Sequence, residues 1–134
     1  MHPNTLRFRI AFLWALLSLG FIQHAVYHLA ELHFGIDIAM KNATGEVPGM
    51  VHAFRLLVDL PCLLLLLLTL YVGGRVFYIV SLVWAGLLCL LNIYHAGITA
   101  VMEPGEISQI GLLLFVAAVN VLLVLELRRA LKTI

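Results

Sequence analysis

Four long apolar runs constrain the fold of this chain more than any other feature of its sequence. A helix needs about 20 residues to cross a hydrocarbon core about 30 Å thick. Runs of that length occur at about residues 6–33, 50–71, 76–97 and 106–127, and the longest connection between them is residues 35–49. The whole chain is therefore predicted to be a single all-α domain, an integral membrane four-helix bundle with up-down-up-down topology.

The composition excludes a soluble domain and limits the partners. Of the 134 residues, 63% are hydrophobic and 11% are charged, whereas roughly a quarter of the residues in a soluble domain are charged. The formal net charge of +1 and the scattered basic residues argue against a nucleic-acid surface. The predicted partner is the lipid bilayer, and a homo-oligomer or a larger membrane complex is compatible with the small size.

Basic residues are distributed unevenly between the two sets of run ends. One set holds Arg7, Arg9, Arg75, Arg128, Arg129 and Lys132. In the opposite loops the basic residue is Lys41. Because short loops rich in Lys and Arg stay in the cytoplasm, both termini and the turn near residue 73 are predicted to be cytoplasmic, in a bacterial inner membrane.

Ionisable residues interrupt the apolar runs in the half that this orientation places outside. His24, His28 and Glu31 lie at i, i+4 and i+7, on one face of a helix. Each such group costs roughly 2.5–3.5 kcal/mol at membrane depth and marks a functional site by default. Pro61 predicts a helix kink near this depth. The other polar residues at the outer ends are His52, Arg55, Asp59, Asn92, His95, Glu103 and Glu106.

A metal or haem site is the preferred interpretation of this cluster, with a function in redox chemistry or metal handling. Imidazoles on neighbouring helices, oriented by carboxylates, build such sites in bundles. Copper, iron or zinc would suit a nitrogen-rich set. Haem b would take His28 and His95 as axial ligands from different helices. The predicted metal ligands are His24, His28, Glu31, His52 and His95.

Other interpretations of the same residues stay open. In a structural or assembly subunit they would pair within the membrane, Arg55 with Asp59 or Glu31 and Asn92 with a histidine. In a small lipid-acting enzyme they would perform acid–base chemistry, but the sequence identifies no nucleophile and no catalytic residue. A pocket for a quinone, a pigment or another lipophilic ligand is a further option.

Two short segments carry a family resemblance. Residues 28–31 read His-Leu-Ala-Glu, and residues 92–95 read Asn-Ile-Tyr-His and are followed by Pro104 and Gly105. In these segments the chain resembles a small bacterial membrane family of unknown function named for a His-x-x-Glu-Glu motif. Leu32 stands where the second motif carboxylate is expected. The resemblance implies that the His, Glu and Asn residues of both segments form one site, and it implies no chemistry.

Overall fold

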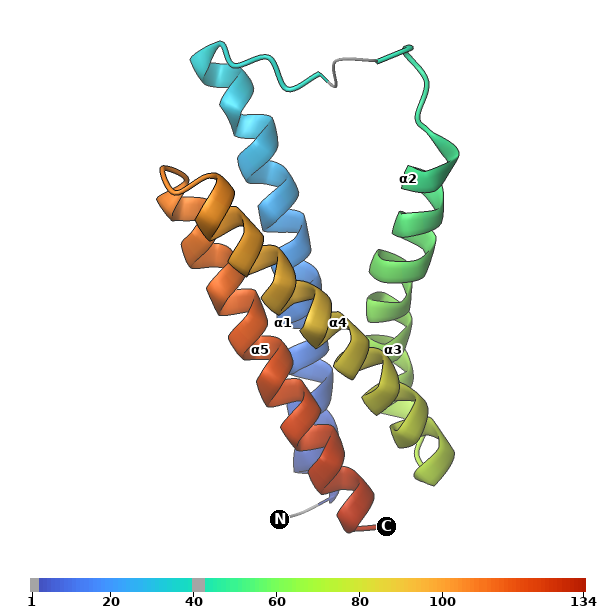
Figure 1. Cartoon of the computed structure of the whole chain (residues 1–134). Helices are drawn as coiled ribbons and strands as arrows, with labels where there is room; N and C mark the ends of the chain where they lie inside the picture. The colour runs from blue at the N-terminus through green and yellow to red at the C-terminus, as the bar shows by residue number, and fades with distance from the viewer. Residues whose placement is uncertain (1–2, 40–42) are drawn as a thin grey trace.

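The chain folds into helices joined by short connections, as the computed structural model of residues 3–39 and 43–134 shows. No strand is present in these two ranges, so the all-α prediction is confirmed. Lys41, which entered the orientation argument, lies outside the described residues. In chain order the elements are α1 (Pro3–Ala30), the 3₁₀ turn η1 (Glu31–Phe34), α2 (Gly49–Phe54), the π-helical turn η2 (Arg55–Asp59), α3 (Leu60–Tyr71), α4 (Arg75–Met102) and α5 (Ile107–Lys132) (Figure 1).

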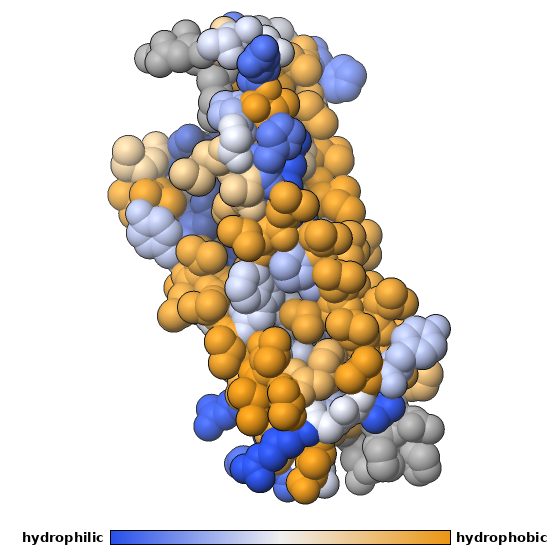
Figure 2. Space-filling view, turned by 90° about the vertical axis from the view of Figure 1, so that its right-hand side faces the viewer, coloured by the Kyte–Doolittle hydropathy of each residue, from blue (hydrophilic) through white to orange (hydrophobic). Residues whose placement is uncertain are grey.

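Four segments of the described chain are long and apolar enough to cross a membrane: Thr5–Phe34, Gly49–Tyr71, Arg75–Met102 and Ile107–Lys132. The protein is therefore an integral membrane protein, and the four-helix prediction is confirmed. The third and fourth spans, α4 and α5, extend beyond the predicted C-terminal ends. Hydropathy identifies the part of a helix that lies in the hydrocarbon core and not the ends that reach water. Figure 2 shows a broad apolar band with hydrophilic residues gathered toward both ends of the molecule.

The helices pack unevenly along their length. α5 packs against both α1 and α4, and α3 packs against α1. The core at these contacts includes the fully buried side chains of Trp14, Leu17, Leu123 and Leu127. Both termini lie at the same end as the turn between α3 and α4, and α2 leans away from the other helices at the opposite end (Figure 1). The bundle is thus closed at the terminal end and open at the other.

The interruption predicted at Pro61 is present as the π-helical turn η2, which directly precedes the proline. The backbone N–H of Leu60 donates to the carbonyl of Arg55, five residues earlier. Proline has no N–H and its ring clashes with the preceding turn, and π turns are a known way to absorb such a disruption. The turn places Arg55 and Asp59 at the point where α2 begins to lean away.

Close packing of α1 on α5 depends on the absence of a side chain at Gly20. A Cβ atom at this position would overlap Cγ2 of the buried Val116. We expect Gly20→Ala to lower the unfolding free energy by about 1–3 kcal/mol, the usual cost of overpacking, measured by denaturant titration in detergent micelles. Gly111→Ala is the control, since a Cβ there meets no atom within 4 Å.

The Val116→Ala background makes this prediction specific, because it removes the methyl group that the new Cβ would meet. In that background Gly20→Ala should cost less than in the wild type. An equal cost in both backgrounds would contradict the assigned contact.

Candidate functional site

A pair of histidines joins α1 to α4 at the open end of the bundle. Nε2 of His95 lies 3.3 Å from Nε2 of His24, although the two residues are 71 positions apart in the sequence. The ring centroids are 5.2 Å apart and the rings are nearly perpendicular, at 87°. His24 is half-buried and His95 is exposed. At this separation one imidazole donates its N–H and the other accepts, so a single proton links the two helices.

His28 extends this pair into a polar chain along α1. Its ring centroid lies 4.8 Å from that of His24. Its Nδ1 is 3.4 Å from Oε1 of Glu31, and the side-chain nitrogen of Gln109 is 3.3 Å from both Nδ1 and Nε2. A tautomer with the proton on Nδ1 can donate to Glu31, while the Gln109 amide contacts the ring. The imidazole is therefore oriented from two sides.

Gln109 is a site residue that sequence reasoning missed. It lies in the first turns of α5, where it is 2% exposed, and its amide reaches His28 on α1. The sequence feature that could have identified Gln109 is its depth, because Gln109 lies near the start of the fourth apolar run, at the level of the histidines. A glutamine near a helix start is common, so depth alone did not distinguish it.

A cavity of about 500 Å³ lies beside the histidine pair, between α1, α4, α5 and the leaning segment α2–η2. Its apolar walls include Phe21, Phe54 and Leu91. The cavity thus combines apolar walls with polar side chains from three separate spans. Its ionisable and amide side chains are His24, Arg55, Asp59, Asn92 and His95.

His52 is not brought to the other histidines. It is exposed on α2 and does not line the cavity, whose wall there is formed by Val51 and Phe54. Glu31 contacts the site only through His28, whose imidazole ring it can orient. Glu103 and Glu106 are exposed at the connection between α4 and α5. Of the five predicted metal ligands, the structure therefore gathers His24, His28 and His95, with Glu31 beside them.

The described residues offer no ready-made metal cage. Across residues 3–39 and 43–134, no group of three or more His, Cys, Asp or Glu side chains is arranged to hold a metal ion. His24 and His95 supply two nitrogens at close range. Metal or haem binding accordingly stays a prediction.

Asn92 has a partner that the sequence did not indicate. It was expected to bond a histidine, but its Nδ2 donates to Oδ1 of Asn120 at 2.8 Å. Asn120 is fully buried on α5 and donates in turn to the carbonyl of Ala85 at 2.9 Å. This chain ties α4 to α5 directly behind the cavity. A lone asparagine in an apolar run gives no periodic signal, which is why Asn120 was overlooked.

The predicted pairing of Arg55 with Asp59 or Glu31 is not observed. In the part of the chain that the structure describes, the ion pairs are Arg9–Glu126, Arg129–Glu126 and His28–Glu31. Arg55 and Asp59 instead line the cavity. A cation and a carboxyl group are thus available to a molecule that enters it.

The chain matches no protein-family model, and comparisons with curated proteins and with solved structures give no match either. The resemblance to the His-x-x-Glu-Glu family therefore rests on its two short segments.

The Asn92–Asn120 bond generates a stability prediction. Asn120→Leu leaves Asn92 without its partner in an apolar interior, and we expect a loss of about 0.6–1.7 kcal/mol in unfolding free energy. The measurement is unfolding of the purified protein by SDS titration.

The double variant Asn92→Leu/Asn120→Leu should recover part of the loss, because removing both partners leaves no unsatisfied amide. If the loss of unfolding free energy in the double variant reaches or exceeds the sum of the losses in the two single variants, the assigned bond is wrong.

Proposed function

We propose that the protein binds an amphiphilic small molecule in the cavity between α1, α4 and the α2–η2 segment. The observation that carries this proposal is one cavity of about 500 Å³ in which Arg55, His24 and His95 meet apolar walls. This volume lies within the usual range of small-molecule sites, about 300–1,000 Å³, and such sites are mostly apolar with a few placed polar groups. The head group would lie at the histidines and the tail among the apolar side chains.

The polar groups indicate which head groups suit the cavity. The guanidinium of Arg55 carries only donors, and an imidazole can donate from Nε2. Asn92 is already engaged by Asn120. Oxygen acceptors on a flat ring, as in a quinone head, would accept from these donors and contact Phe21 and Phe54. A ligand of this class would enter from the bilayer, since α2 leans away on that side.

A transition-metal ion held by His24 and His95 is the second candidate, and one distance favours it. Two imidazole nitrogens bound about 2.05 Å from one tetrahedral ion lie about 3.3 Å apart, and the observed separation of the two Nε2 atoms is 3.3 Å. Copper, iron or zinc would fit such a pair, with water or the ligand completing the shell. In the haem b version, His28 and His95 would hold the iron, which would supply redox chemistry.

The ligand proposal predicts the behaviour of two cavity variants. Ala25→Trp fills the cavity, and Arg55→Gln removes its cation; both residues line it. We expect either change to weaken binding of decylubiquinone at least tenfold, because a hydrogen bond to a charged group contributes about 1.5–3 kcal/mol. Binding is measured by titration of the purified protein and by mass spectrometry of its solvent extract.

His33→Ala is the matched control, since His33 is exposed near the same end and does not line the cavity. It should bind the quinone like the wild type. Equal affinity in all four proteins, or no bound lipophilic molecule in any, would refute the ligand proposal.

The metal candidate predicts a different pattern among the histidines. His24→Ala and His95→Ala should each abolish bound metal, because each removes one of two protein nitrogens, whereas His52→Ala should keep it. Elemental analysis of the purified protein gives the metal content, and a Soret band in the absorption spectrum would identify haem. Metal lost equally in His52→Ala would contradict the two-histidine site.

A further inference from the structure

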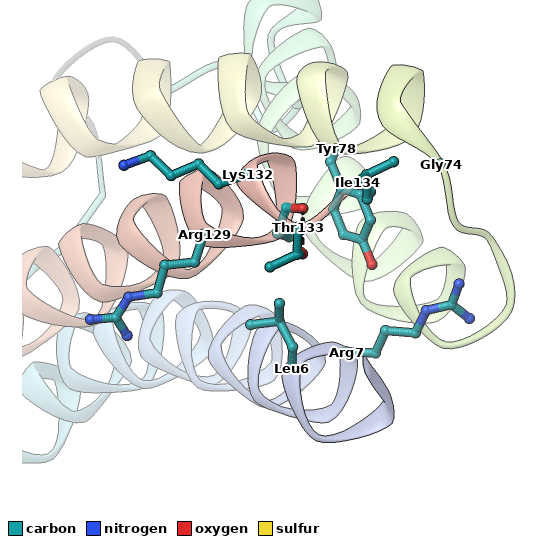
Figure 3. Close-up of a pocket in the computed structure, with 9 residues that line it drawn as sticks. Leu6, Arg7, Gly74, Tyr78, Arg129, Lys132, Thr133 and Ile134 are labelled. Carbon is teal, nitrogen blue, oxygen red and sulfur yellow. Dashed lines mark hydrogen bonds between the residues drawn. The ribbon is translucent and has the colours of Figure 1, made fainter. Parts of the chain in front are cut away.

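A second cavity lies at the opposite end of the molecule, where both termini meet the turn between α3 and α4. Its volume is about 620 Å³. The start of α1, the start of α4 and the end of α5 enclose it, as Figure 3 shows. The residues that line it are Leu6, Arg7, Gly74, Tyr78, Arg129, Ala130, Lys132, Thr133 and Ile134.

Three of these lining residues are cations, and they come from two helices. Arg7 extends from one side of the cavity, and Arg129 and Lys132 extend from the other (Figure 3). Arg129 is paired with Glu126 at 2.7 Å. Among the described residues, Arg7 and Lys132 take part in no ion pair. The cavity therefore keeps an excess of positive charge.

Two neutral groups of the cavity lining also favour an anion. Tyr78 is 4% exposed, and its hydroxyl points between Thr133 and Arg7 (Figure 3). Gly74 precedes α4, and no side chain caps the first N–H groups of that helix. Uncapped N–H groups at a helix start carry a partial positive charge. The Tyr78 hydroxyl and the start of α4 thus lie on the same side of the cavity as Arg7, whereas the charged ends of Arg129 and Lys132 point to the opposite side (Figure 3).

The apolar part of the wall indicates which anion suits the cavity. Leu6 and Ala130 are buried there, and Ile134 closes one side. A cavity of 620 Å³ exceeds what a single ion needs and lies in the range of larger ligands. The arrangement suits a charged head joined to an apolar chain, at the height where the bilayer meets water.

We infer that this cavity binds the phosphate head group of an anionic phospholipid. Basic pockets between membrane helices on the cytoplasmic side are well suited to such head groups, and the positive-inside rule assigns this end to the cytoplasm. The phosphate would accept from Arg7 and Tyr78, and Lys132 would add positive charge on the other side of the cavity (Figure 3). The first acyl carbons would lie against Leu6 and Ile134. Inorganic phosphate shares the head-group chemistry but has no chain for that wall.

Native mass spectrometry of the full chain, released from vesicles of phosphatidylglycerol and phosphatidylcholine, tests the inference. The wild type should retain phosphatidylglycerol selectively. Arg7→Gln/Lys132→Gln should lower that selectivity about tenfold, because it removes the charged donor to the phosphate together with a second cation that lines the cavity. The control is Arg75→Gln/Arg128→Gln, which removes the same charge from the same end at exposed positions that do not line the cavity.

A charge-neutral variant separates the site from the general surface potential. The guanidinium of Arg7 lies over Gly73, and a Cβ at that position would overlap it. Gly73→Ala should displace Arg7 without changing the net charge or the fold, and should lower selectivity for phosphatidylglycerol several-fold. Tyr78→Phe, which keeps the buried ring, should lower it less.

Three results would overturn the inference. The first is an equal loss of selectivity in the Arg75/Arg128 control, which would assign the effect to surface charge. The second is wild-type selectivity in both Arg7→Gln/Lys132→Gln and Gly73→Ala. The third is displacement of phosphatidylglycerol by an equal concentration of inorganic phosphate, which would assign the cavity to the free ion. Circular dichroism of each variant confirms that the helices are intact.

Discussion

The lack of water in the hydrocarbon core is the constraint on which the rest of this structure depends. Backbone groups there must bond within the chain, so the spans are helical. Polar side chains face the same requirement. Ser18 and Thr69 donate to carbonyls four residues earlier on their own helices, whereas Asn92 donates across to Asn120, which donates in turn to a carbonyl of α4. Only the second solution joins spans together, and it does so directly behind the cavity with the histidine pair.

The second span is interrupted at the open end of the bundle. The π-helical turn η2 lies directly before Pro61, and α2 leans away from the other helices beyond it (Figure 1). Arg55 and Asp59 lie in this turn and line the cavity. This backbone irregularity therefore supplies the charged side chains of the cavity, which agrees with the frequent occurrence of π turns at functional sites.

Sequence reasoning predicted the helices and the depth of the polar residues. It did not predict for every residue, and not for His52, which way the side chain points around the axis of its helix. Apolar runs of membrane length determine how many spans there are and which ends share a side, so His24 and His95 could be placed at one level. Whether they meet depends on which face each helix turns inward. For His52 that face is set by the lean of α2, which no periodicity in the sequence encodes. Gln109 and Asn120 were missed because a single amide in an apolar run carries no pattern.

Residues of α1 line both cavities. Arg7 lies at one end of this helix and His24 at the other. Between them α1 is held on α5, where Gly20 meets Val116 so closely that no side chain fits. Gly20 and Val116 also line the cavity beside the histidines. The contact that fixes α1 in the bundle is thus part of the wall of that cavity.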